Sequence, residues 1–95
     1  MHIITQKRIR EAQRNWPEAG DALSGWLRIM RRIEPHNAAQ LKTFFPAVDK
    51  VGDLFVFNIG GHRLRLIASV RFKVKRVYIR AIIDHKEYDK GNWKK

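Results

Sequence analysis

The sequence predicts an α+β domain in which two N-terminal helices and a short third helix pack on one face of an antiparallel sheet of three to four strands. Apolar residues recur with the period of a helix through residues 9–33, and from residue 50 the period changes to two. Helices followed by a run of strands are typical of α+β domains. Because 95 residues are the size of one domain, we expect residues 1–95 to form a single unit.

The first helix is expected over residues 6–15. Thr5 can cap it, because a threonine hydroxyl at that position accepts a hydrogen bond from a backbone N–H of the first turn. Pro17 is tolerated in a first helical turn and therefore favours a restart over a continuation. The apolar residues of this helix lie at helical spacing: Ile9, Ala12 and Trp16.

The second helix has the clearest apolar stripe of the chain, and Pro35 ends it. Asn37 followed by Gln40 is a capping-box pattern, which begins a short third helix that Pro46 closes. Tryptophans within such stripes indicate core positions rather than ligand platforms. The stripe of the second helix consists of Ala19, Ala22, Leu23, Trp26, Leu27, Met30 and Ile33.

Three strands are expected at residues 54–59, 62–72 and 76–84, and a short strand over residues 49–52 would be a fourth. Gly60-Gly61 suits the first hairpin turn. Alternation assigns the strand residues to two faces. The face expected under the helices carries Phe55, Phe57, Ile59, Leu64, Leu66, Ala68, Val70, Phe72, Val77, Ile79, Ala81 and Ile83. The opposite face, here called the basic shelf, carries Asn58, Arg63, Arg65, Tyr78 and Arg80.

The charge of the chain indicates a polyanionic partner. The net charge is +11, and residues 60–95 hold eleven Lys or Arg against three Asp or Glu. A solvated basic surface without a partner is the alternative. An anionic membrane is a poorer fit, because the basic segments read as strands rather than as an amphipathic helix. With no cysteine, no apolar leader and no membrane span, the sequence favours a cytoplasmic protein.

The motifs of metal and phosphate sites are missing from the sequence. There is no CxxC, no HExxH and no phosphate-binding glycine loop, and the four histidines are scattered. We therefore expect no metal and no cofactor. The remaining chemical groups are Arg65, Arg80, His85, Lys86 and Tyr88.

Metal-free RNA cleavage needs only such groups. A base takes the proton of a 2′-hydroxyl, cations stabilise the phosphorane, and an acid protonates the 5′-oxygen that leaves. Each residue also has a structural interpretation: the arginines can be solvated, Tyr88 can pack on the sheet, and His85 can cap the strand end. On residue types alone, RNA or DNA binding without catalysis is favoured over cleavage.

A resemblance changes this balance. The segments that carry it run through most of the chain in order: "MHIIT", Leu41-Lys42 with Phe45-Pro46, "VFNIGG", Arg65-Leu66-Ile67, "YIR" and "HKEYD". In these segments the chain resembles the HigB-type toxins of bacterial type II toxin–antitoxin modules, a branch of the RelE superfamily. The resemblance implies a RelE-like fold, cleavage of mRNA in the ribosomal A site, and silencing by a DNA-binding antitoxin.

The resemblance also implies residue roles. Arg65 matches the strand arginine that binds the scissile phosphate, and His85, Lys86 and Tyr88 match the C-terminal catalytic cluster. The classical RelE site is crowded with Lys and Arg, whereas this chain offers a histidine. Because histidine exchanges protons near neutral pH, His85 is the natural acid or base, and Tyr88 suits stacking on a nucleobase.

Further residues are expected to contact RNA. Asn58 and Arg80 match family positions on the strands, and Arg63 suits a phosphate contact. The remaining cations suit ribosomal RNA and fall into two groups: Lys73, Lys75 and Arg76 on the turn, and Lys7, Arg8 and Arg10 on the first helix. Two alternatives stay open: a non-catalytic RNA-binding module, and an inactive or DNA-binding member of the toxin–antitoxin module. We expect cleavage to need the ribosome, which would position the substrate.

Overall fold

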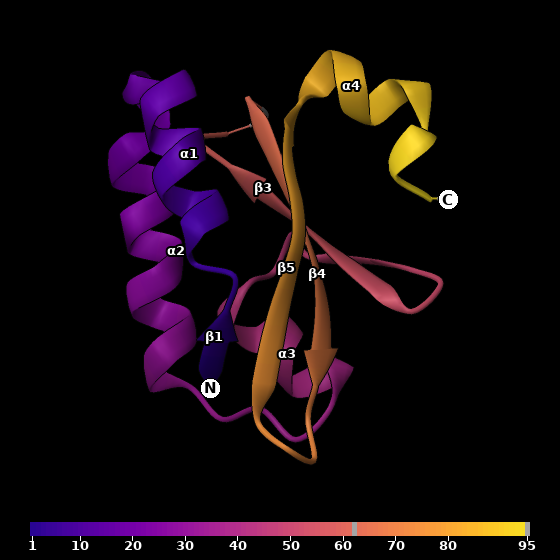
Figure 1. Cartoon of the computed structure of the whole chain (residues 1–95). Helices are drawn as coiled ribbons and strands as arrows, with labels where there is room; N and C mark the ends of the chain where they lie inside the picture. The colour runs from indigo at the N-terminus through magenta and orange to yellow at the C-terminus, as the bar shows by residue number, and fades with distance from the viewer. Residues whose placement is uncertain (62, 95) are drawn as a thin grey trace.

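The computed structural model describes residues 1–61 and 63–94. Its elements, in chain order, are β1 (His2–Ile4), α1 (Lys7–Asn15), the 3-10 helix η1 (Pro17–Ala19), α2 (Gly20–Arg32), α3 (Ala38–Phe44), β2 (Asp49–Val51), β3 (Leu54–Ile59), β4 (Leu64–Arg71), β5 (Arg76–Asp84), α4 (His85–Lys90) and the 3-10 helix η2 (Asn92–Lys94). Helices α1 and α2 lie on one side of the sheet, and the C-terminal segment with α4 lies on the other (Figure 1).

The sheet is five-stranded, in the order β1-β5-β4-β3-β2. The predicted α+β class with helices covering one sheet face is confirmed, but the strand count of three to four was too low. The missing strand is β1, which pairs in parallel with β5 and makes the sheet mixed. A three-residue strand is too short to show a period of two. Its place is secured by the N-terminal amino group of Met1, which donates to the carbonyl oxygens of Met30 at 3.2 Å and Ile33 at 2.9 Å.

The predicted cap at Thr5 is wrong. Helix α1 begins at Lys7, and its capping position is Gln6, whose side chain makes no capping hydrogen bond. Thr5 instead has a φ of 73°, and its carbonyl oxygen accepts a hydrogen bond from the backbone N–H of Arg8 at 3.1 Å. Strand β1 runs directly into α1, so the chain reverses direction at Thr5. Thr5 is left-handed for this reason, whereas a residue whose side chain caps a helix needs an extended conformation.

The other predicted helix boundaries are confirmed. Pro17 begins η1, and α2 ends at Arg32, before Pro35. The side chain of Asn37 accepts a hydrogen bond from the backbone N–H of Gln40 at 2.9 Å. The side chain of Gln40 returns to accept from the backbone N–H of His36 at 2.7 Å, so the capping pattern is reciprocal, with its second bond one residue before the cap.

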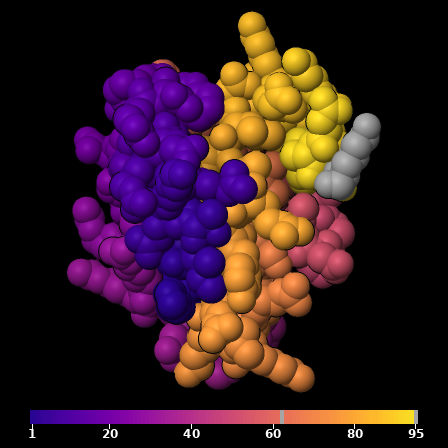
Figure 2. All heavy atoms as spheres, viewed as in Figure 1, coloured from indigo at the N-terminus to yellow at the C-terminus, as the bar shows by residue number. Residues whose placement is uncertain are grey.

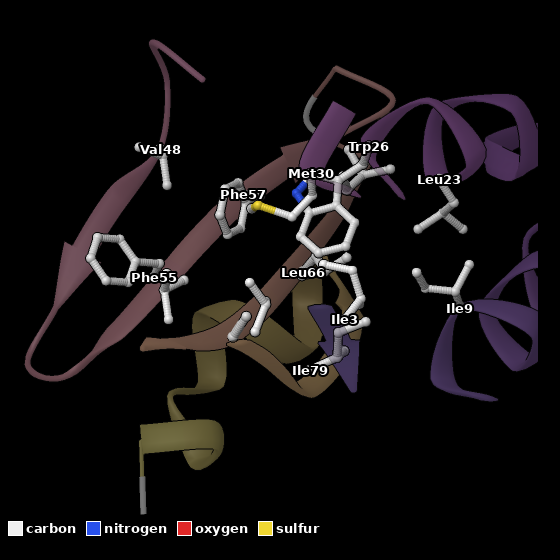
Figure 3. Close-up of a cluster of buried hydrophobic side chains, with 14 of the residues drawn as sticks. Ile3, Ile9, Leu23, Trp26, Met30, Val48, Phe55, Phe57, Leu66 and Ile79 are labelled. Atoms are coloured by element: carbon white, nitrogen blue, oxygen red, sulfur yellow. The ribbon is translucent and has the colours of Figure 1, made fainter. Parts of the chain in front are cut away.

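The core lies between the helices and the apolar sheet face (Figure 3). Trp26 on α2 contacts the ring of Phe57 on β3 edge-on, with centroids 5.4 Å apart, and Phe45 contacts Phe57 at 5.1 Å. Trp26 is only 3% exposed, as the helical stripe predicts, and Trp16 packs half-buried against the same core. The indole Nε1 of Trp26 has no hydrogen-bond partner among the described residues.

The strands lie where they were predicted, but some of their residues point to the opposite face of the sheet. Strands β3 and β5 have the predicted bounds, β2 matches the short fourth strand, and Gly60 and Gly61 turn the chain with φ of 62° and 73°. The predicted strand over 62–72 is shorter, Leu64–Arg71, and residue 62 lies outside the described residues.

A β-bulge in β5 reverses the predicted facing of the end of that strand. Ala68 pairs with Ile79 and Ile67 pairs with Ala81, so Arg80 is an extra residue without an opposite partner. Beyond it the alternation is inverted, because a bulge adds one residue to one strand only. Ile82 therefore packs on the core, whereas Ala81 and Ile83, predicted to face the helices, lie on the basic shelf.

Candidate active site

The C-terminal segment builds one wall of the site. Strand β5 ends at Asp84, whose carboxylate accepts a hydrogen bond from the backbone N–H of Glu87 at 2.8 Å and so caps α4. Helix α4 ends at Gly91, which has a φ of 75°. His85, Lys86 and Tyr88 were predicted to lie beyond the strand, but no helix was predicted there. The signal was present, since Asp84 with Glu87 three residues later, followed by Gly91, marks the two ends of a helix.

An arginine and two aromatic rings form a stack at the centre of the basic shelf. The guanidinium carbon of Arg65 on β4 lies 5.3 Å from the ring centroid of Tyr88 on α4. Tyr88 in turn stacks on Trp93, with centroids 4.9 Å apart and planes at 12°. Lys94 Nζ lies 5.6 Å from the Trp93 centroid. Each ring therefore has a cation near it, Arg65 at Tyr88 and Lys94 at Trp93, and cations are attracted to aromatic faces.

A cavity of about 430 Å³ lies beside Arg65 and Tyr88. Asn58 also lines it, and the register places Asn58 directly opposite Arg65 across the β3–β4 ladder. The structure therefore brings Asn58, Arg65 and Tyr88 together around one cavity. Lys42 on α3 lines the same cavity and was not assigned to the site, since no pattern places the end of α3 next to β3.

His85 and Lys86 are exposed at the start of α4. His85 Nδ1 lies 3.3 Å from Asp89 Oδ2, one turn further along the same helix. Residues three apart on a helix are neighbours, so His85 and Tyr88 share one side of α4. Lys86 is two residues from Tyr88 and does not share that side.

A larger groove of about 880 Å³ runs over β4 and β5. Its cationic lining residues are Arg8, Arg71, Arg80 and Lys94, and Asp53 is the acidic one among the described residues. Arg71 and Arg80 have no ion-pair partner in the described part of the chain. Strand β5 is open at the surface between the N-terminal and C-terminal segments (Figure 2). Trp93 and Lys94 were not predicted as groove residues, because no sequence pattern indicates that the chain folds back after Tyr88.

Arg63 does not join the other residues of the basic shelf. Its guanidinium lies 3.2 Å from the carboxylate of Glu18 in η1. The pKa of the exposed Glu18 carboxyl lies below its ordinary value of 4.5. The largest cause is a hydrogen bond from the backbone N–H of Glu18 itself, and the Arg63 guanidinium lowers the pKa further. The alternation rule failed here because Arg63 precedes the first residue of β4, Leu64, and is not part of the ladder.

The turn cations lie at the other end of the hairpin. Lys73, Lys75 and Arg76 surround the β4–β5 turn, whereas α4 follows the opposite end of β5 (Figure 1). Lys75 Nζ pairs with the carboxylate of Glu34 at 3.5 Å. The structure therefore separates these cations from the Arg65–Tyr88 contact.

Comparison with known proteins decides the family. A family model described as the RelE-like toxic component of a toxin–antitoxin system, HigB_toxin, matches residues 19–91. The chain belongs to the HigB toxin family. It is 36% identical over 92 residues to the mRNA interferase toxin HigB of Escherichia coli strain K12, covering 94% of this chain and 88% of the relative. The mRNA interferase HigB of Shigella flexneri matches equally, and that of Escherichia coli O6:H1 strain CFT073 is 32% identical over 93 residues, covering 95% of this chain and 90% of the relative.

Membership of the HigB family implies an antitoxin partner, because the family is the toxic half of a two-component system. Two further findings concern the described residues of this HigB-family chain. They contain no cluster of three His, Asp or Glu side chains placed to hold a metal ion. They also contain no helix with the length and apolar character needed to cross a membrane.

Proposed function

We propose that this chain is an mRNA interferase, an endoribonuclease that cleaves translated mRNA on the ribosome and is neutralised by a cognate, DNA-binding antitoxin. The observation that carries the proposal is the contact of Arg65 with Tyr88 on the basic shelf, beside a groove whose arginines form no ion pair within the described part of the chain. The relatives are named as mRNA interferases, which supports the reaction. A cytoplasmic site of action follows from that substrate.

Arg65 is proposed to bind the scissile phosphate. It is half-buried on β4 between Asn58 and Ile83, so its position is fixed by the ladder on both sides. A guanidinium offers paired donors that match two phosphate oxygens, and it stabilises the charge that builds up on the phosphorane. Asn58, opposite Arg65, can hold a further oxygen of the same nucleotide.

His85 is proposed as the proton-transfer group. Removal of a 2′-hydroxyl proton lets that oxygen attack phosphorus, and the bond from phosphorus to the 5′-oxygen breaks as that oxygen gains a proton. Asp89 lies beside His85 and can orient its imidazole. Tyr88, whose ring already contacts Arg65 and Trp93, is proposed to assist at the leaving oxygen, and Lys86 to add positive charge.

The RNA strand is proposed to follow the larger groove. Arg71 and Arg80 lack acidic partners in the described residues and can each meet a phosphate, as can Arg8 at the edge of β5. The cations at the far end of the hairpin and on α1 are proposed to contact ribosomal RNA: Lys73, Lys75 and Arg76, with Lys7 and Arg10. Lys75 and Lys7 would have to exchange their exposed pairs with Glu34 and Glu11 for such contacts. Arg63, tied to Glu18, is a weaker candidate for RNA.

Primer extension on a defined mRNA in a cell-free translation reaction tests the proposal. The reactions contain the wild-type protein, His85→Ala or Arg65→Ala, each with and without ribosomes. Discrete cuts that require ribosomes and disappear in the variants are expected. The second candidate function, a non-catalytic RNA-binding module, is favoured by the same unpaired cations. It would be supported by intact mRNA in every reaction while the protein still sediments with ribosomes.

A further inference from the structure

Trp93 follows the C-terminal helix α4 and contacts Tyr88 of the candidate site. Two separate contacts join it to Tyr88. The rings stack at 4.9 Å and 12°, and the indole Nε1 donates a hydrogen bond to the Tyr88 carbonyl oxygen at 2.9 Å. The two contacts together hold the indole in one orientation against Tyr88.

The backbone makes this return possible at Gly91. Its φ of 75° reverses the chain directly after α4, and its N–H also donates to the Tyr88 carbonyl oxygen, at 3.1 Å. The Tyr88 carbonyl thus accepts from both Gly91 and Trp93. The 3-10 turn η2 then fixes the indole, since Lys94 N–H donates to the Gly91 carbonyl oxygen at 3.2 Å.

Among the described residues, the ring contacts of Tyr88 are those with Trp93 and with the Arg65 guanidinium. Helix α4 has no fully buried residue, so the core does not hold this part of the chain. The stack on Trp93 restricts the side-chain torsions of Tyr88 and keeps its ring within 5.3 Å of the Arg65 guanidinium carbon. Reacting groups displaced by about 1 Å can lose about 100-fold in rate.

We propose that Trp93 is a positioning residue, which acts through Tyr88 and does not itself contact the scissile phosphate. The inference rests on the proposed catalytic role of Arg65 and Tyr88. Its consequence is specific: removal of the indole should slow cleavage without weakening the binding of the protein to the ribosome. An aromatic ring that still stacks should restore the rate.

The test compares Trp93→Ala, Trp93→Phe and Tyr88→Ala with the wild type. Asn92→Ala is the matched control, because Asn92 is exposed in the same 3-10 turn. Three quantities are measured: the single-turnover cleavage rate on programmed ribosomes, the affinity for those ribosomes, and the near-ultraviolet circular dichroism of the free protein. Thermal unfolding checks that each variant is folded.

Trp93→Ala is expected to slow cleavage by about 10- to 100-fold, to leave ribosome affinity within twofold, and to lose the same circular-dichroism signal that Tyr88→Ala loses. Trp93→Phe should recover most of the rate, and Asn92→Ala should match the wild type. A rate for Trp93→Ala equal to that of the wild type, with Tyr88→Ala inactive, would overturn the inference and leave the proposed function intact.

Other results would reject the inference for different reasons. If Trp93→Ala loses ribosome affinity in proportion to rate, Trp93 contacts RNA and is not a positioning residue. If Trp93→Phe is as slow as Trp93→Ala, stacking is not its role. If Tyr88→Ala cleaves normally, or if the wild type does not cleave, the site or the proposed function fails, and the inference fails with it.

Discussion

Arg65 on β4 and Asn58 on β3 are direct partners across the ladder and line the same cavity. This pairing fixes the height at which a phosphate would sit above the sheet, because neither residue can shift without disturbing the register that the buried residues of both strands impose. The electrostatic role of Arg65 should therefore depend on the shape of its side chain as well as on its charge.

Arg65→Lys should lower the cleavage rate by about 10-fold or more, since a lysine lacks the planar fork of donors that fits a phosphate. Arg65→Ala should lower it further, by about 100- to 1,000-fold. Single-turnover cleavage on ribosomes measures both. Arg28→Ala is the control, because Arg28 is an exposed cation on α2, on the other side of the sheet. Equal rates for Arg65→Lys and the wild type would contradict this interpretation.

His85→Ala should lower the cleavage rate by about 100- to 10,000-fold if the imidazole transfers the proton. Asp89→Asn should have a smaller effect, because the proposed role of Asp89, 3.3 Å from the imidazole, is only to orient it. Single-turnover cleavage on programmed ribosomes measures the rates of both variants against the wild type. Lys90→Gln, on the same helix, serves as control. An unaltered cleavage rate in His85→Ala would assign the proton transfer elsewhere.

Removal of Arg71 and Arg80 together should weaken the binding of a non-cleavable single-stranded RNA. Each phosphate contact that is lost should reduce the slope of log affinity against log salt by about 0.7. The measurement is a salt titration of binding, with the exposed Arg14 of α1 replaced by Ala as control. An unchanged slope in the double variant would show that the larger groove does not hold the strand.

Trp26→Phe should cost much less stability than Trp26→Ala. The indole Nε1 is buried without a partner in the described residues, so the wild type already carries the penalty of a buried unpaired donor, which phenylalanine removes. Trp26→Ala should cost about 3–5 kcal/mol through the cavity that it leaves against Phe45 and Phe57. Urea unfolding gives both values. A loss for phenylalanine as large as that for alanine would mean that the N–H is satisfied in solution.

The Arg63–Glu18 pair should make stability depend on acid pH. The pKa of Glu18 is lowered in the folded state, first by its own backbone N–H and then by Arg63, so the pair supplies part of a stabilisation that is present above the ordinary pKa of 4.5 and disappears as the pH falls through the folded value. Arg63→Gln should therefore be less stable than the wild type near neutral pH and equal to it in acid. In a Glu18→Gln background, Arg63→Gln should make no difference. A gap that persists at low pH would rule out the ion pair as its source.

Much of the fold was predictable because its signals are local. The apolar stripe of α2, the cap at Asn37 and the alternation in β3 are each formed by residues that are close together in the sequence. The bulge at Arg80 and the parallel strand β1 were not predictable, because both arise from pairing between segments far apart in the sequence. The same reason explains Arg63, whose direction is set by Glu18, 45 positions earlier in the chain.

The candidate site divides in the same way. Arg65 and Asn58 could be placed together from alternation, and the structure confirms that they share a cavity. Trp93 and Lys42 could not, because their contribution depends on how a short terminal turn and the end of a helix return to the sheet. Residue types indicated the chemistry, whereas tertiary packing selected which residues surround it.

The unpaired residue at Arg80 has a consequence for how this chain tolerates changes in length. Loss of a single residue from β5 would delete no group of the Arg65–Tyr88–Trp93 stack. Because the bulge is itself one extra residue, its loss would leave a regular ladder in which Ile79, Ala81, Ile82 and Ile83 follow one another and keep their present partners and faces. Relatives of this chain should therefore accept one residue fewer between Ile79 and Asp84, whereas the loss of a second residue would turn the end of the strand, and α4 with it, to the other face.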